Sequence, residues 1–130
     1  MMYNNTVREC FFYPRHAGVI DLSQDLVVVF KNNQKGQGNI EFYMQCGQDR
    51  VIQKIRFKTN GNPYLIAGLE WLGRQLEGQY IDAIRQIDYQ LLINELDIPT
   101  PQYPLALRVV NVFKESLILM NNKLAAGQHS

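Results

Sequence analysis

The most constraining feature of the sequence is a change of period between residues 50 and 76. From 50 to 59, apolar and basic side chains alternate, which is typical of a strand with one buried face. After Pro63 the apolar residues recur every three or four positions, which predicts an amphipathic helix. We therefore expect this helix to pack on the apolar face of the sheet that precedes it. The strand face is expected to comprise Val51, Ile55 and Phe57, with Ile52 on the other side, and the helical stripe Leu65, Leu69, Leu72 and Leu76.

The segments before residue 50 predict a helix followed by two strands. Residues 3–12 have the pattern of a short amphipathic helix, which Pro14 ends. Residues 26–30 are a β-branched run, and residues 40–46 alternate with Ile40, Phe42, Met44 and Cys46 on one face, so both segments are predicted strands. A polar loop is expected at 32–38, and a hairpin turn at 47–49 joins the second strand to the third.

The segments after residue 76 predict helices and one proline-rich connector. Gly78 is well placed to stop the central helix, and two short helices are expected at 80–85 and 88–96. Three prolines make residues 98–104 a stiff segment that is expected not to be helical. Pro104 suits the first turn of a last helix, and a frayed tail is expected at 125–130. The buried stripe of that helix is predicted to be Leu105, Val109, Val112, Phe113, Leu117 and Met120.

This order of elements predicts one domain, residues 1–130, of the α+β class: a three-stranded antiparallel sheet with helices packed on one face. The net charge of +1 gives no basis for binding nucleic acid. No apolar run approaches the roughly 20 residues that span a bilayer. The polar start of the sequence does not resemble a signal peptide, so we expect a cytoplasmic protein without membrane contacts, whose two cysteines stay reduced.

The sequence contains no common catalytic or metal-binding motif: no Walker loop, no GxGxxG after a strand, no HExxH and no CxxC. His16 is expected to be a solvated or backbone-bonded side chain in a turn rather than a ligand. Cys10 and Cys46 are expected to be buried apolar fillers, because free cysteine is among the most buried residue types. Whether either thiol has a redox role stays open. From these residues alone we expect a domain that is not an enzyme.

A row of basic residues is predicted on the polar face of the third strand. Two interpretations are open: a solvated sheet face, or a docking surface for an acidic partner. Tyr64 and Trp71 on the central helix are interpreted as core or rim residues rather than as a binding platform. The row consists of Arg50, Lys54, Arg56 and Lys58.

Three groups of residues have a recognisable spacing when they are taken together. Tyr3, Val7, Pro14-Arg15, Gly18 and Asp21 form the first, RFKTNGN at 56–62 the second, and ELDIPTP at 95–101 the third. This arrangement resembles the IscU/NifU-type iron–sulfur cluster assembly scaffolds, with their RFKTxGC motif and EL-x-LPPVK segment. The resemblance covers nearly the whole chain and implies an IscU/SufE-like fold.

The resemblance also implies where the family holds its cluster, on three cysteines and an aspartate. The Cys-Gly-Asp motif is replaced by Gln37-Gly38-Asn39, the second cysteine by Asn62, and the His-Cys pair by Pro104-Leu105. Clusters are held by thiolates, whereas amides are weak neutral ligands, so we expect neither an iron–sulfur cluster nor zinc. Whether the former pocket has closed into the core or become inert surface turns stays open.

The resemblance implies a cysteine desulfurase, or another iron–sulfur assembly protein, as partner. The leading hypothesis is a scaffold-like protein that has lost its cluster and acts as an adaptor or regulator. Pro99 and Pro101 keep the frame of the family's chaperone-binding segment, although its lysine is replaced by Gln102. Alternatives are an atypical participant in cluster assembly with partner-supplied ligands, and a binder of a small polar ligand in the former pocket.

Overall fold

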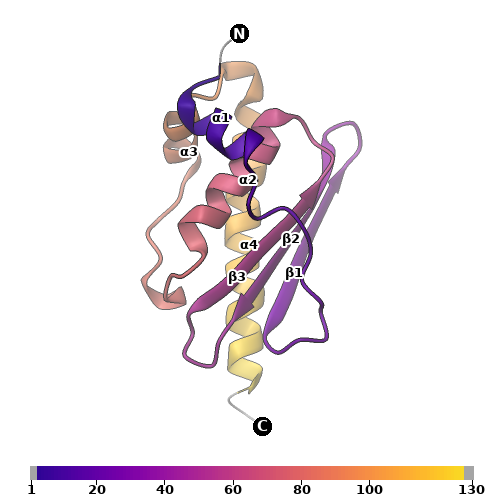
Figure 1. The fold of residues 1–130 in the computed structure, drawn as a ribbon, viewed down its shortest axis with the longest axis vertical. Coiled ribbons are helices and arrows are strands. Elements are labelled where there is room, and N and C mark those ends of the chain that lie inside the picture. The colour runs from indigo at the N-terminus through magenta and orange to yellow at the C-terminus, as the bar shows by residue number, and fades with distance from the viewer. Residues whose placement is uncertain (1–2, 128–130) are drawn as a thin grey trace.

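The structure is a computed structural model that describes residues 3–127, and it has the predicted α+β class (Figure 1). A three-stranded antiparallel sheet has the order β1-β2-β3, so each strand pairs with its neighbour in the chain. The elements are α1 (Asn5–Phe12), β1 (Val27–Gln34), β2 (Gly38–Cys46), β3 (Ile52–Thr59), α2 (Pro63–Leu76), the 3-10 turn η1 (Ile81–Ala83), α3 (Tyr89–Leu96), the 3-10 turn η2 (Thr100–Gln102) and α4 (Tyr103–Gly127).

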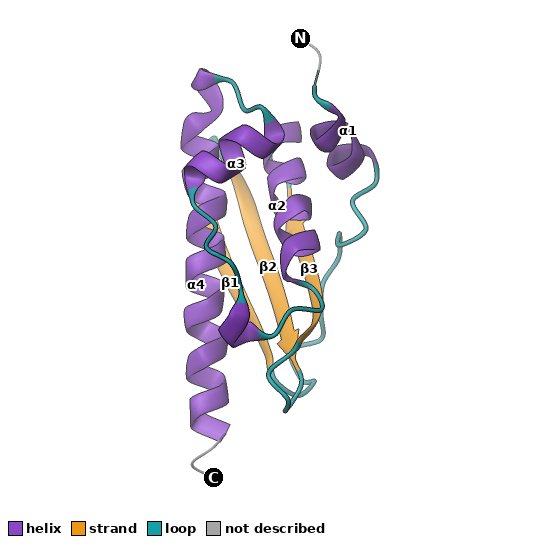
Figure 2. Ribbon diagram, turned by 90° about the vertical axis from the view of Figure 1, so that its left-hand side faces the viewer, coloured by secondary structure: helices purple, strands orange, loops and turns teal. Residues whose placement is uncertain are grey.

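The helices cover one face of the sheet, with α2 on the β3 side and α4 on the β1 side (Figure 2). The predicted stripe of α2 is confirmed, because all four leucines are fully buried. They face the apolar side of β2, where Ile40, Phe42 and Met44 are also fully buried. This interface is the main core of the fold. No helix between residues 3 and 127 is long and apolar enough to cross a membrane.

A β-bulge changes the predicted face of β3. Gln45 pairs with Lys54 but Cys46 pairs with Ile52, so Gln53 is an extra residue on β3. The bulge turns Ile52 into the core, where none of its surface is exposed, while Val51 is only half-buried beside the strand. The prediction that Val51 faces the core and Ile52 faces away is therefore wrong, because strict alternation does not anticipate an inserted residue.

Three predicted boundaries also differ from the structure. The loop expected at 32–38 is a tight turn at residues 35–37, because β1 continues to Gln34 and β2 begins at Gly38. The helix expected at 80–85 is only the three-residue η1, and the tail expected from residue 125 is helical through Gly127. The rest of that tail, residues 128–130, lies outside the described residues.

The prediction that residues 98–104 are not helical is also wrong. Thr100–Gln102 form η2, and α4 begins immediately afterwards at Tyr103. Proline fits the first turn of a 3-10 or α-helix, because its fixed φ is close to the helical value and its missing N–H has no partner there anyway. The prolines therefore start helical turns here rather than hold an extended linker.

The second face of the sheet is partly covered by the segment that follows α1. After α1, the chain makes a parallel bridge with β3 at Ala17, and the N–H of Gly18 donates to the carbonyl oxygen of Phe57 at 2.8 Å. It then crosses this face to reach β1 (Figure 1). Ile20 packs there in a small buried cluster with Val27 and Tyr43.

Candidate functional site

Three of the four predicted site residues line one cavity of about 340 Å³ at the rim of the sheet. Gln37 comes from the turn between β1 and β2, Asn62 precedes α2, and Leu105 lies in the first turn of α4. Leu105 is buried, whereas the two amide residues are exposed. The cavity therefore combines an apolar wall with a polar mouth.

Asn39 does not join this cavity. Side chains alternate along β2, so Asn39 lies on the opposite side from the buried Ile40 and borders a neighbouring depression with Asn60 and Lys58. Its backbone N–H donates to Asn60 Oδ1 at 2.7 Å, and Thr59 Oγ1 donates to its carbonyl oxygen at 2.6 Å. Asn39 thus joins the start of β2 to the end of β3 and the loop after it through its backbone.

The start of β2 and the loop after β3 touch at a pair of glycines. Gly38 has a φ of +90°, and a Cβ added there would lie 2.8 Å from the Cα of Gly61. A side chain at Gly38 is therefore excluded both by the left-handed backbone and by contact with another backbone.

Asn62 has a clear structural role. Its Oδ1 accepts a hydrogen bond from the N–H of Leu65 at 3.1 Å, which caps the first turn of α2. Its Nδ2 donates to Gln102 Oε1 at 3.0 Å, which ties this cap to η2. Pro101 lines the cavity beside Gln102, whereas Pro99 is the half-buried residue before η2.

Arg108 is a member of the cavity that the sequence interpretation missed. Its Nη1 donates to the carbonyl oxygen of Gln37 at 2.6 Å, and its Nη2 donates to that of Gly38 at 2.8 Å. Nη2 and Nε also donate to Asn32 Oδ1, at 2.7 and 3.2 Å. Desolvation lowers the pKa of this guanidinium, which nevertheless stays charged. The spacing in the sequence could have indicated Arg108, because a residue three positions after Leu105 on a helix faces the same side.

The donors of this cavity do not fit an iron–sulfur cluster or a thiolate zinc site. Amides, leucine methyl groups and a guanidinium surround it, and none of them is a soft anionic ligand. Cys10 and Cys46 are buried elsewhere, as predicted, and burial raises the pKa of each thiol to about 11. Between residues 3 and 127, no three His, Cys, Asp or Glu side chains lie together as a metal ligand set.

The predicted basic row is interrupted, because Arg50 does not belong to it. Arg50 lies in the turn before β3 with a φ of +67°, and it makes a bidentate ion pair with Asp82. It also donates to Asn121 of α4 at 3.2 Å, so it points toward the helices. Lys54, Arg56 and Lys58 keep the predicted face, and Arg56 lies 3.5 Å from Glu77.

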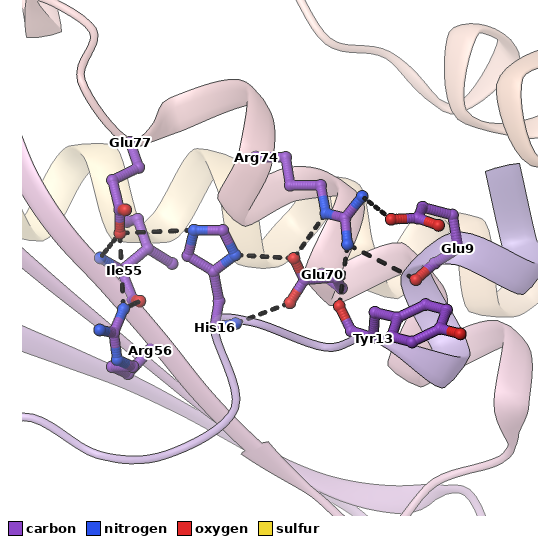
Figure 3. Close-up of polar contacts among 8 residues, drawn as sticks. All are labelled: Glu9, Tyr13, His16, Ile55, Arg56, Glu70, Arg74 and Glu77. Atoms are coloured by element: carbon purple, nitrogen blue, oxygen red, sulfur yellow. Dashed lines mark hydrogen bonds and ion pairs between the residues drawn. The ribbon is translucent and has the colours of Figure 1, made fainter.

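A second polar cluster lies between the N-terminal segment and α2, where the sequence predicted none (Figure 3). His16 is only 5% exposed, and its Nδ1 lies 2.7 Å from Oε2 of the fully buried Glu70. Arg74 Nε donates to the same Glu70 oxygen at 2.7 Å, and the backbone N–H of His16 donates to Oε1 at 2.8 Å. The expectation of a solvated or merely backbone-bonded His16 is therefore wrong.

The packing around this cluster explains why His16 is buried. Gly73 on α2 has no side chain, and a Cβ added there would lie 3.0 Å from Cγ of His16. Burial by itself disfavours the Glu70 carboxylate, but the hydrogen bonds from His16 and Arg74 outweigh it and lower the pKa of this group. Glu70 is therefore an ionised, fully paired carboxylate that joins the N-terminal segment to the central helix.

The comparisons with known proteins agree with this architecture. The family of the NifU-like N terminal domain matches residues 2–124. An iron–sulfur cluster assembly scaffold assigned to the SUF system of thermophilic Fervidobacterium islandicum AW-1 has a similar structure, with a TM-score of 0.62, 14% identity and coverage of 90% of this chain and 94% of that one. The N-terminal part of a nitrogen-fixing NifU-like protein from Brucella abortus is similar too, with a TM-score of 0.64, 11% identity and coverage of 95% and 94%.

No curated protein matches the sequence. The family match nevertheless spans almost the entire chain, and both similar structures share its fold over nine-tenths or more of their length. The resemblance in the motifs at 56–62 and 95–101 lies within the matched range. The chain therefore belongs to the family of NifU-like N-terminal domains, which are related to iron–sulfur cluster scaffolds.

Proposed function

We propose that this protein is a NifU-like scaffold that no longer holds a cluster and acts as an adaptor or regulator in iron–sulfur and sulfur-transfer metabolism. The observation that carries the proposal is the chemistry of the rim cavity. Gln37, Asn62 and Leu105 converge there, and these are the positions at which the family resemblance implies thiolates. These three side chains include no nucleophile, acid or base, so we propose a function of binding rather than of catalysis.

The contacts within the cavity support the loss of the cluster. In a metal site, ligand bonds hold together segments that would otherwise be separate, and they contribute to folding. Here Arg108 joins α4 to the turn at Gln37, and Asn62 joins α2 to Gln102 of η2. Hydrogen bonds within the chain thus connect these segments without a metal.

The proposed partner is a cysteine desulfurase or another iron–sulfur assembly protein. Lys54 and Lys58 on the open face of β3 make no ion pair within residues 3–127, and they are available to an acidic surface. Pro101 is exposed beside the rim cavity, whereas Pro99 is half-buried. Arg50 is excluded from this surface, because Asp82 already pairs with it.

The proposal is tested by reconstituting the purified chain with iron and sulfide under reducing, anaerobic conditions in the presence of a cysteine desulfurase. We expect little bound iron and no visible charge-transfer absorption, together with a stable complex in a pull-down. A matched control carries cysteine at the three positions that line the cavity, Gln37→Cys, Asn62→Cys and Leu105→Cys, and we expect it to acquire iron. Stoichiometric iron with visible absorption in the unmodified chain would overturn the proposal.

A further inference from the structure

We infer that the rim cavity binds a small organic carboxylate or another small oxyanion, with Arg108 as the charged group that recognises it. This inference deepens the proposed function, because it concerns the same cavity, but it does not require that the chain docks on a desulfurase. Its ligand contacts would come from Arg108 and from the amides at the cavity mouth.

Arg108 differs from the other half-buried arginines, because no carboxylate within residues 3–127 pairs with its charge. Arg50, Arg56, Arg74 and Arg108 are half-buried, and the first three pair with Asp82, Glu77 and Glu70. Arg108 has only neutral partners within residues 3–127, namely two backbone carbonyl groups and Asn32. A partly desolvated guanidinium with no counter-ion attracts an anion strongly, because the surrounding protein screens the charge less than water does.

The guanidinium is also fixed in position before any ligand binds. Its contacts with Asn32, Gln37 and Gly38 fix the side chain, so an incoming anion does not have to order a flexible arginine. Among the described residues Nη1 makes a single hydrogen bond, to the carbonyl oxygen of Gln37, which leaves its second N–H for an acceptor. The side-chain amides of Gln34 and Gln37 line the same cavity, make no hydrogen bond within residues 3–127, and can donate to the same anion.

The size and walls of the cavity define the ligand further. A volume of about 340 Å³ lies at the lower end of the range for small-molecule sites. The buried side chain of Leu105 and the rings of Pro101 and Pro104 form apolar walls beside the polar groups. This combination suits an anionic group with a short hydrocarbon part, which favours a small carboxylate over an inorganic oxyanion.

The test is a titration of the isotope-labelled chain alone, followed through its backbone amide resonances. Sodium butyrate and sodium phosphate are the two probes, each compared with sodium chloride at equal ionic strength. We expect saturable shifts that map to the turn at residues 35–37 and to the start of α4. Saturation with butyrate identifies an organic carboxylate as the ligand class, and saturation with phosphate alone identifies an inorganic oxyanion.

Three variants separate this site from general charge effects. Arg108→Gln is expected to weaken binding about tenfold or more, since it removes the charged hydrogen bond. Gln37→Glu places a competing carboxylate beside Arg108 and keeps the backbone carbonyl group that Arg108 binds, so the fold is retained and binding is again lost. Lys114→Gln removes the same charge from an exposed position on α4 away from the cavity, and it should bind as the unmodified chain does.

The inference is overturned if neither anion gives saturable shifts, or if Arg108→Gln and Gln37→Glu bind as well as the unmodified chain. Equal weakening by Lys114→Gln would also overturn it, because the binding would then follow overall charge. The titration contains neither iron nor a partner protein, so its failure leaves the proposed function standing. Conversely, iron loading of the unmodified chain would overturn the proposed function and leave the titration result unchanged.

Discussion

Nδ1 of His16 lies 2.7 Å from Oε2 of Glu70, inside the interface between the N-terminal segment and α2. Glu70 has no exposed surface, and the second ring nitrogen of His16 lies 3.4 Å from Glu77. A buried carboxylate is tolerated only when its hydrogen bonds are complete, and here Arg74 and the backbone N–H of His16 supply the others. The N-terminal segment is therefore attached to the central helix by charged groups as well as by apolar contacts.

Replacing Glu70 should destabilise the fold markedly. Glu70→Gln leaves His16 and Arg74 without their shared carboxylate, and we expect a loss of about 3 kcal/mol in the free energy of unfolding. Glu9→Gln is the matched control, because Glu9 is exposed and lies 3.6 Å from the same Arg74. It should cost less than about 0.5 kcal/mol. Urea denaturation followed by the fluorescence of the buried Trp71 measures both; equal effects would contradict the role assigned to Glu70.

The same carboxylate predicts a pH dependence of stability. The pKa of Glu70 is lowered in the folded protein, so the unfolded chain binds a proton at this group more readily than the folded chain does. Its contribution is fully present above the ordinary glutamate value of about 4.3 and is lost as the pH falls through the lower folded value. Urea midpoints measured between neutral pH and acid should fall more steeply for the unmodified chain than for Glu70→Gln. Parallel curves would contradict this assignment.

A side chain at Gly38 should disturb the contact between the two rim loops. Gly38→Ala places a Cβ on a left-handed backbone and against the Cα of Gly61. We expect it to lower the free energy of unfolding by about 2–3 kcal/mol. Gly36→Ala tests the backbone term separately, because Gly36 has a φ of +77° with open space around its Cβ position. Gly36→Ala should lower the free energy of unfolding by about 1 kcal/mol. Thermal unfolding of the two variants measures the difference, and an equal loss would show that the contact with Gly61 adds nothing.

The two thiols should be unreactive in the folded protein. Burial raises the pKa of both Cys10 and Cys46 to about 11, so the nucleophilic thiolate is scarce near neutral pH. We expect slow labelling by a thiol-specific disulfide reagent under native conditions and rapid labelling of both groups in urea. Fast labelling of either thiol in the folded chain would contradict this prediction and leave its redox role open.

The sequence predicted the elements that depend on a regular period. The four leucines of α2 and the alternating face of β2 are buried as expected, because periodicity follows directly from helix and strand geometry. The alternation predicted the wrong face for Ile52, because one inserted residue turns this side chain into the core. The local pattern also predicted the wrong environment for His16, whose burial depends on the missing side chain of Gly73. Both features arise from contacts between distant segments, which no local pattern records.

The candidate site was partly predictable for the same reason. The motif spacing predicted Gln37, Asn62 and Leu105 as site residues, and the fold places them around one cavity. Asn39 follows the alternation of β2 and lies outside it. Arg108 was missed because an arginine on a helix surface is usually solvated, and only the tertiary structure brings it to the carbonyl groups of the turn at residues 35–37 and Gly38.

The short parallel bridge between Ala17 and Phe57 has a consequence for strand addition. Backbone groups of His16 and Gly18 already satisfy those of Phe57, so the outer border of β3 offers little to an extended peptide. On the other border, β1 pairs with β2 alone among residues 3–127, so β1 is the free edge strand of the sheet. A partner that extended the sheet would therefore have to join at β1, where the exposed Lys31 opposes indiscriminate pairing.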